Sequence, residues 1–147
     1  MTKILKQADS LFKDIRHNIS LLANASAFLN EVISDINWVG FYLFENGKLH
    51  LGPFQGKAAC TPIEIANGVC GYAFRENKIT NVPDVTKFPG HIVCDNASKS
   101  ELVIPLIKSG ITFGVLDVDS PLLNRFDENT TNLIVSISEI IINYYNL

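Results

Sequence analysis

The order of sequence patterns along the 147 residues predicts an α+β fold built on a mostly antiparallel sheet. Apolar residues recur at helical spacing near both ends of the chain, and short β-rich segments lie between these two regions. Several of the joins between the short segments are tight hairpins, which connect antiparallel strands, rather than helical crossovers. We therefore expect about six strands, with the N- and C-terminal helices on one face and a short helix and loops over the other.

The N-terminal third of the chain predicts helix followed by a hairpin. From Ala8 to about Ile36, apolar residues recur every three or four positions, and we place an interruption of this helical pattern near Asn24. The aromatic and β-branched segment 38–44 then predicts a strand. Asn46-Gly47 favours a type I′ turn, because both central residues take positive φ, and the chain returns through a strand over residues 49–51.

The middle of the chain alternates short elements with loops that glycine and proline punctuate. We expect the following segments: a loop over 52–67 with a short strand at 63–65, a glycine-containing lead at 68–71 into a helix at 72–77, a strand at 79–82, and an irregular stretch over 83–99. A loop as long as the last of these is usually functional or disordered.

The C-terminal part predicts a second hairpin and a last helix. Strands at 101–107 and 111–119 are joined by Lys108-Ser109-Gly110. Asp127-Glu128 opens the final helix with acidic residues, which the helix dipole favours at that end. There is no internal repeat and no linker, so a single domain over residues 1–147 is the expectation.

Composition excludes several classes of protein. Lysine and arginine number 12 against 15 acidic residues, a formal net charge of −3, with no basic cluster, which argues against nucleic-acid binding. No apolar run reaches the roughly 18 residues that a membrane span requires. We therefore expect a cytoplasmic protein that contacts neither nucleic acid nor membrane.

Three cysteines are an odd number, which cannot close a disulfide framework. No C-x-x-C pair occurs, so the spacing excludes a zinc ribbon and a thioredoxin-like site. The three histidines and three cysteines nowhere approach ligand spacing, and we expect no metal site. His17 and His50 are expected at the surface without partners.

Each thiol has a functional and a structural interpretation. Cys94 lies in the long loop, three residues after His91 and seven before Glu101, where a reactive thiol would be accessible; a small buried hydrophobe is the alternative. Cys70 lies where helix N–H groups would lower its pKa, although the position could simply require a small residue. Cys60, in a punctuated segment, suits a mobile resolving thiol or a bystander.

Two pairs of alternating residues share strand faces. Asp117 and Asp119 are two apart, so both point to one face, where they could bind a cationic ligand or lie solvated at the strand end. Trp38 and Tyr42 are four apart and form an aromatic wall, which could be core or pocket.

Six stretches between Trp38 and Ser120 form a specific combination: Trp38-Val39-Gly40-Phe41-Tyr42, Gly52-Pro53-Phe54-Gln55-Gly56-Lys57 with Cys60, Gly68-Val69-Cys70-Gly71, Phe88-Pro89-Gly90-His91-Ile92-Val93-Cys94-Asp95, Ser98-Lys99-Ser100-Glu101-Leu102-Val103-Ile104-Pro105, and Gly114-Val115-Leu116-Asp117-Val118-Asp119-Ser120. In this order and spacing they resemble the free methionine-(R)-sulfoxide reductases, single-domain enzymes of the GAF fold that reduce the R epimer of free methionine sulfoxide.

The resemblance implies roles for the residues already singled out. It implies that Cys94 is the nucleophile, that Cys60 resolves the oxidised form, and that Cys70 is an alternative partner or the attacking residue. It further implies that Glu101 and Asp119 contact the substrate, with Asp117 nearby. Trp38 and Tyr42 would shape the pocket for the substrate's methyl group. An intramolecular disulfide would be recycled by thioredoxin, with NADPH and its reductase, and no cofactor would be bound. A homodimer is expected, as is common for the fold.

Two other classes compete with this enzyme. One is a non-catalytic GAF module that binds a small ligand and signals through a dimer; it does not need three thiols at these spacings. The other is a thiol peroxidase, which shares sulfenic acid chemistry but has no use for an aromatic methyl pocket and two substrate carboxylates.

Overall fold

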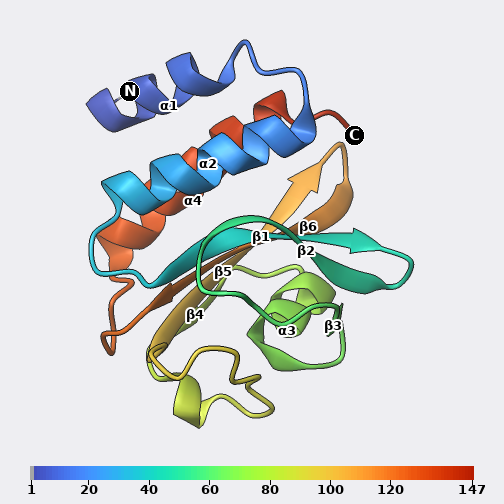
Figure 1. Ribbon diagram of the computed structural model, residues 1–147, viewed down its shortest axis with the longest axis vertical. Helices are drawn as coiled ribbons and strands as arrows, with labels where there is room; N and C mark the ends of the chain where they lie inside the picture. The colour runs from blue at the N-terminus through green and yellow to red at the C-terminus, as the bar shows by residue number, and fades with distance from the viewer. Residues whose placement is uncertain (1) are drawn as a thin grey trace.

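The computed structural model describes residues 2–147, which form three layers (Figure 1). The elements, in chain order, are α1 (Lys3–Phe12), α2 (Asn18–Val32), β1 (Trp38–Glu45), β2 (Lys48–Gly56), β3 (Ile63–Glu64), α3 (Gly68–Glu76), β4 (Thr80–Val82), the 3-10 turn η1 (Val85–Lys87), β5 (Ser100–Lys108), β6 (Ile111–Ser120) and α4 (Glu128–Tyr144). Helices α1, α2 and α4 lie on one side of the sheet, and α3 lies with the loops on the other side.

The sheet has six strands in the order β3-β2-β1-β6-β5-β4, and each neighbouring pair is antiparallel. The long strands β1, β6 and β5 occupy its centre, and the two shortest strands form its edges. These observations confirm the predicted α+β fold. The sheet has about the expected number of strands, and the terminal helices lie together on one of its faces.

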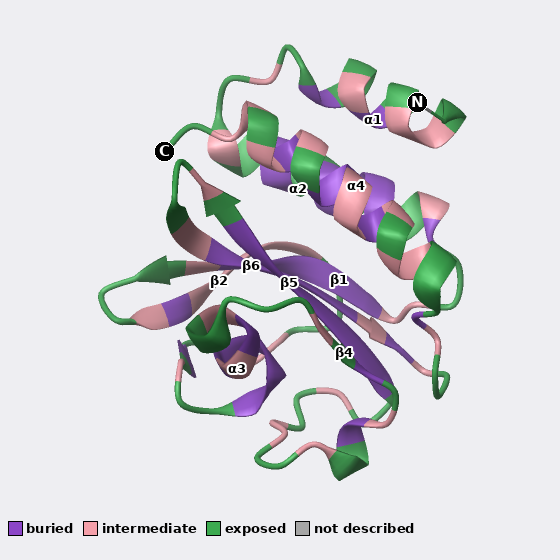
Figure 2. Cartoon of the chain, turned by 180° about the vertical axis from the view of Figure 1, so that it is seen from behind, coloured by how far each residue is buried: buried purple, intermediate pink, exposed green. Residues whose placement is uncertain are grey.

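One face of the sheet packs against the helical layer. Val39 and Phe41 of β1 alternate into this core with Leu116 of β6, as expected for strand residues two apart. Helix side chains such as Leu29 and Ile137, both fully buried, complete it, and Figure 2 shows the buried stripe along α2 and α4 facing the strands. This core joins one whole face of the sheet to the helical layer.

The opposite face carries a second, smaller core with α3. Trp38 and Tyr42 of β1 belong to it, together with Val69 and Cys70 of α3. Helix α3 packs closely over the backbone, because a Cβ on Gly71 would lie only 2.8 Å from the carbonyl oxygen of Ile65 and 2.9 Å from that of Glu64. The absence of a side chain at Gly71 therefore sets the depth at which α3 sits.

The break in the N-terminal helical region was predicted in the wrong place. The structure has two helices separated by residues 13–17, and α2 runs through Asn24 without interruption. Asn24 is exposed, while Leu21, Leu22 and Ala25 on the other side of α2 are buried. Packing of that apolar face maintains the helix despite the low helix propensity of asparagine.

The two hairpins follow prediction, but one return strand is longer than predicted. Asn46 and Gly47 have φ of 52° and 79°, and Ser109 and Gly110 have 52° and 77°, as type I′ turns require. Strand β2 extends to Gly56, although glycine and proline at 52 and 53 suggested a loop. The β1–β2 register shifts between Gly40 and Tyr42, and Pro53 falls at this irregularity, where no ladder hydrogen bond is needed.

The remaining differences are small. The short helix begins at Gly68 rather than at residue 72, and the long loop contains η1. His17 is exposed as expected, whereas the Nε2 atom of His50 lies 3.0 Å from the carbonyl oxygen of Glu45, so the prediction that His50 has no partner is wrong. Among residues 2–147, no helix is long and apolar enough to cross a membrane.

Gly71→Ala tests how tightly α3 packs. In an ordinary helix this change stabilises by about 1 kcal/mol, but here the new methyl group meets two backbone carbonyls, so we expect a loss of roughly 1–3 kcal/mol. Urea unfolding followed by circular dichroism measures it. Glu76→Ala, at the exposed end of the same helix, is the control and should change stability by no more than about 0.5 kcal/mol. A stability gain in Gly71→Ala would contradict this packing.

Candidate active site

The register of the three central strands aligns functional side chains in one row. Trp38 of β1 pairs with Asp119 of β6, and Asp119 pairs in turn with Glu101 of β5. Two residues further along, Gly40 pairs with Asp117. Since residues two apart share a face, Trp38, Asp119, Glu101 and Asp117 all lie on the α3 side of the sheet.

The aromatic wall predicted from the spacing of Trp38 and Tyr42 is present. Their ring centroids are 5.9 Å apart, and the ring of Phe54 of β2 also stacks with the indole, at 5.2 Å. A Cβ on Gly40 would lie 2.3 Å from the Cβ of Phe54, so only glycine allows this stack. The indole N–H donates to the carbonyl of Lys57, and the Tyr42 hydroxyl donates to the carbonyl of Cys60. The aromatic residues therefore anchor the loop that carries Cys60.

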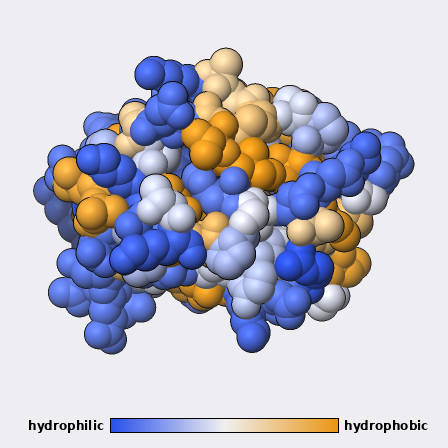
Figure 3. Space-filling model, turned by 90° about the horizontal axis from the view of Figure 1, so that it is seen from below, coloured by the Kyte–Doolittle hydropathy of each residue, from blue (hydrophilic) through white to orange (hydrophobic). Residues whose placement is uncertain are grey.

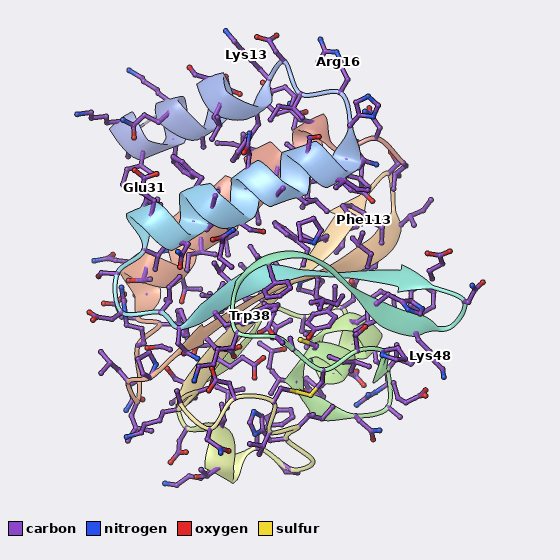
Figure 4. All side chains as sticks on the ribbon, in the orientation of Figure 1. Lys13, Arg16, Glu31, Trp38, Lys48 and Phe113 are labelled. Carbon is purple, nitrogen blue, oxygen red and sulfur yellow. A yellow bond between two sulfur atoms is a disulfide. The ribbon has the colours of Figure 1, made fainter. Side chains whose placement is uncertain are left out.

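Cys60 and Cys94 are joined by a disulfide, with their Cα atoms 5.8 Å apart. The bond connects the loop after β2 to the long loop before β5, and Figure 4 shows it as a yellow bond below the sheet. Cys94 is exposed, so it is not the small buried hydrophobe of its structural alternative, and Cys60 is half-buried. Its bond to Cys94 argues against the alternative that Cys60 is a bystander.

The loop of Cys94 is held by Asn37, a residue that sequence reasoning missed. The Asn37 amide donates to the carboxylate of Asp95, at 3.1 Å, and to the hydroxyl of Ser98, at 3.0 Å. Its backbone N–H donates to the carbonyl of Asp119, which ties the loop to β6. The sequence feature that could have indicated a role for Asn37 is its position directly before Trp38.

Glu101 and Asp117 are buried carboxyl groups, 6% exposed each, and Asp119 beside them is partly exposed. Burial, and after it the charge of Asp119, raises the pKa of Glu101 to about 8. Burial raises the pKa of Asp117 and of Asp119 well above the usual range, with neighbouring carboxylates as the next cause. Near neutral pH, Glu101 is thus a carboxylic acid that can donate a proton.

His91 also belongs to this group of side chains, although the sequence alone indicates it only as a neighbour of Cys94. Its Nε2 atom lies 3.7 Å from an Oε atom of Glu101. Burial lowers the pKa of His91, opposed by the charge of Asp117. With an imidazole that tends to be neutral and a carboxyl that tends to be protonated, the contact is between uncharged groups at neutral pH rather than an ion pair.

Cys70 is not the most acidic thiol that its helix position suggested. It is the third residue of α3, but it is 5% exposed and faces Asp117. Burial, and then the negative charges of Asp117, Glu101 and Asp119, raise the pKa of the Cys70 thiol. Desolvation and nearby carboxylates outweigh the helix N-terminus, so the prediction of a lowered pKa is wrong.

All of these side chains line one cavity between the sheet and the two loops: Trp38, Tyr42, Cys70, His91, Cys94, Glu101, Asp117 and Asp119. Of the predicted site residues, only Cys60 does not line the cavity. It is disulfide-bonded to Cys94, which does, and the neighbouring Ala59 also lines the cavity. Figure 3 shows this side of the molecule, where hydrophobic residues form patches within a mostly hydrophilic surface. A small molecule here would meet aromatic rings, carboxyl groups and sulfur atoms.

The raised pKa of Glu101 predicts a specific pH dependence of stability. The folded protein keeps the Glu101 proton up to about pH 8, whereas the unfolded carboxyl releases it near the ordinary glutamate pKa of 4.5. The unfolding free energy should therefore fall as pH rises from 6.5 to 8, by up to about 1.4 kcal/mol per pH unit for this one proton. Asp117 and Asp119 add to the same slope. The lowered pKa of His91 acts with opposite sign, below pH 6.5.

Urea unfolding of the disulfide form at closely spaced pH values measures this slope. Glu101→Gln should flatten it by about one proton, while the exposed control Glu45→Gln should leave it unchanged. An identical slope in wild type and Glu101→Gln would contradict the assignment of this proton.

Comparison with known proteins places the chain in a family. The GAF domain profile matches residues 8–143. The free methionine-R-sulfoxide reductase of Escherichia coli is 51% identical over 116 residues, which are 78% of this chain and 70% of that protein.

Solved structures of proteins with the same name also resemble this chain. The fRMsr of Staphylococcus aureus in its reduced form is 49% identical, with a TM-score of 0.93 over 96% of this chain and 92% of its own. The free methionine-R-sulfoxide reductase of Neisseria meningitidis in complex with its substrate is 39% identical, with a TM-score of 0.92 over 97% of this chain and 86% of its own. The chain therefore belongs to the GAF-domain family, within the group of the free methionine-R-sulfoxide reductases.

Proposed function

We propose that the protein reduces free L-methionine (R)-S-oxide to L-methionine by thiol chemistry. The Cys60–Cys94 disulfide beside a cavity lined by Trp38 and three carboxyl groups carries this proposal. A module that only binds a small ligand has no need of such a disulfide, so a non-catalytic GAF domain is the weaker interpretation. The names of the relatives at 39% to 51% identity support the same activity.

In the first step, the thiolate of reduced Cys94 attacks the sulfoxide sulfur. The S–O bond of the sulfoxide breaks, the oxygen is transferred to the Cys94 sulfur to give a sulfenic acid, and methionine departs as the reduced product. A proton must reach the oxygen as the bond breaks. Glu101, which holds a proton near neutral pH and lines the same cavity, is the proposed donor.

In the second step, Cys60 resolves the sulfenic acid. Its thiol attacks the Cys94 sulfur, the disulfide forms and water leaves, so each turnover oxidises two thiols and reduces one sulfoxide. The Cα atoms of these residues already lie 5.8 Å apart, within the range of a disulfide. Cys70 is free and buried on α3, which makes Cys60 the better resolving partner in this arrangement.

The carboxyl groups of Asp117 and Asp119 would recognise the ammonium group of a free amino acid. No lysine or arginine of residues 2–147 forms an ion pair with either of them, so a ligand cation would supply the missing charge. A methionine sulfoxide within a peptide has no such ammonium group. The indole face of Trp38 suits the polarisable methyl sulfur group.

The reductant would be thioredoxin, supplied by NADPH and its reductase, in the cytoplasm. A thiolate of thioredoxin would attack Cys94, since Cys94 is exposed whereas Cys60 is half-buried. We further propose a homodimer. Exposed apolar side chains on the helical layer, Leu11 at 41% and Ile19 at 75%, support an interface there.

Single cysteine variants should separate the thiol roles. Cys94→Ser should form no methionine above background, because the attacking sulfur is missing. Cys60→Ser should form up to one methionine per chain in a single turnover and then stall, and Cys70→Ser should retain repeated turnover. Quenched-flow chromatography of methionine measures all three, and full turnover by Cys94→Ser would refute the assignment.

The carboxyl variants should differ in which kinetic parameter changes. Glu101→Gln should lower kcat by about 10²- to 10⁴-fold with little change in KM, because it removes the proton donor. Asp119→Asn should mainly raise KM, because it weakens the ammonium contact. The exposed Glu45→Gln is the control. Comparable activity in wild type and both site variants would contradict these roles.

One coupled assay distinguishes the candidate functions. NADPH oxidation in the presence of thioredoxin and its reductase should occur with the R epimer of methionine sulfoxide, and not with the S epimer or with hydrogen peroxide. Consumption with peroxide would indicate a thiol peroxidase, and no consumption with any of the three would indicate a binding module.

A further inference from the structure

A compact set of potential metal ligands lies inside the cavity. The Sγ atom of Cys70 and carboxylate oxygens of Glu101 and Asp117 all lie within 4.8 Å of one another. His91 lies beside this set, with its Nε2 atom 3.7 Å from Glu101, and is the nearest candidate for a fourth donor. These residues come from α3, β5, β6 and the long loop, which is why spacing along the sequence gave no sign of a ligand set.

A second observation indicates that this set is open to a cation. Asp117 lines the cavity and is only 6% exposed, yet its buried Oδ1 atom has no hydrogen-bond partner. A buried carboxylate oxygen without a partner is costly. Within residues 2–147, no lysine or arginine side chain pairs with Asp117, and its side-chain contacts with Cys70 and Glu101 bring no positive charge, so a cation beside it would come from outside the chain.

The donor types select the kind of cation. Calcium and magnesium prefer oxygen ligands, whereas a thiolate and an imidazole beside carboxylates suit zinc. Donor atoms around tetrahedral zinc lie roughly 3.3 to 3.8 Å apart, given the usual zinc–ligand bond lengths. The donor atoms of Cys70, Glu101 and Asp117, within 4.8 Å of one another, need to approach by up to about 1 Å to reach this range. His91, 3.7 Å from Glu101, lies outside that compact set and must rotate toward Cys70 and Asp117 to complete the coordination.

We propose that Cys70, Glu101 and Asp117, with His91, bind one zinc ion, and that this ion inhibits the enzyme reversibly. Binding replaces the thiol proton of Cys70, and the protons that the carboxyl groups of Glu101 and Asp117 hold, by bonds to zinc and releases these protons to water; no residue changes its oxidation state. The ion occupies Glu101 and Asp117, so it competes with the substrate for the same carboxyl groups. Only this inhibitory consequence rests on the proposed function.

The disulfide form is the suitable protein for the test. Cys60 and Cys94 are bonded to each other and cannot bind the metal, while Cys70 remains free. Cobalt(II), a spectroscopic substitute for zinc, gives a thiolate-to-metal charge-transfer band in the near ultraviolet and intense visible bands when tetrahedral. We expect both at one cobalt per chain, with displacement by one equivalent of zinc.

Variants assign the ligands. Cys70→Ser should lose the charge-transfer band, and Asp117→Asn should weaken zinc affinity at least tenfold in competition with a chromophoric chelator. Asp14→Asn, an exposed carboxylate far from these ligands in sequence, is the matched control and should keep wild-type affinity. No band in the wild type, or an undiminished band in Cys70→Ser, would overturn the metal site. Circular dichroism of each variant verifies that it is folded.

Two readouts keep this proposal separate from the proposed function. Free methionine should displace cobalt from the disulfide form, and zinc should raise the apparent KM of the reduced enzyme until a chelator restores it. Cobalt binding with no reductase activity in metal-free protein would refute the function and leave the site. Reductase activity without a cobalt signal would refute the site and leave the function. Cobalt that methionine cannot displace would refute the competition.

Discussion

The active site depends on the antiparallel register of β1, β6 and β5. This register places Trp38, Asp119 and Glu101 directly opposite one another, with Asp117 one step further along the same face. A slip by one residue would turn all of these side chains into the core on the other face. The core between the sheet and α2 and α4, with Val39, Phe41 and Leu116 pointing into it, prevents that slip. The hydrophobic core therefore fixes the positions of the polar site.

The chemical character of the site follows from burying carboxyl groups without cations. In water Glu101, Asp117 and Asp119 would all be ionised, but on this face of the sheet burial raises the pKa of each. The charge of Asp119 further raises the pKa of Glu101, that of Glu101 the pKa of Asp117, and that of Asp117 the pKa of Asp119. Two consequences follow from one arrangement: a protonated carboxyl is available near neutral pH, and a cation is attracted to the remaining charge. The same environment keeps Cys70 a thiol until a metal ion replaces its proton. Proton donation, ammonium recognition and zinc binding thus depend on the same unpaired carboxyl groups.

Sequence reasoning predicted what depends on local pattern. Alternation correctly placed Asp117 with Asp119, and Trp38 with Tyr42, on shared faces, and the Asn-Gly pair correctly predicted a hairpin. It could not predict which strands lie side by side, so the row from Trp38 to Glu101 and the approach of His91 emerged only from the fold. The error on Cys70 has the same origin, since a helix N-terminus is visible in sequence, whereas burial against Asp117 is not. The break between α1 and α2 was misplaced because tertiary packing overrode the low helix propensity at Asn24.

If the Cys60–Cys94 disulfide is the product of sulfoxide reduction, it must form together with methionine in a single turnover. Fully reduced protein is mixed with a single equivalent of free methionine (R)-sulfoxide, quenched with acid and digested for mass spectrometry. We expect one methionine formed per chain, a peptide pair linked through Cys60 and Cys94, and Cys70 still a free thiol. Methionine formed with Cys70 in the disulfide, or a Cys60–Cys94 bond that forms without methionine, would contradict it.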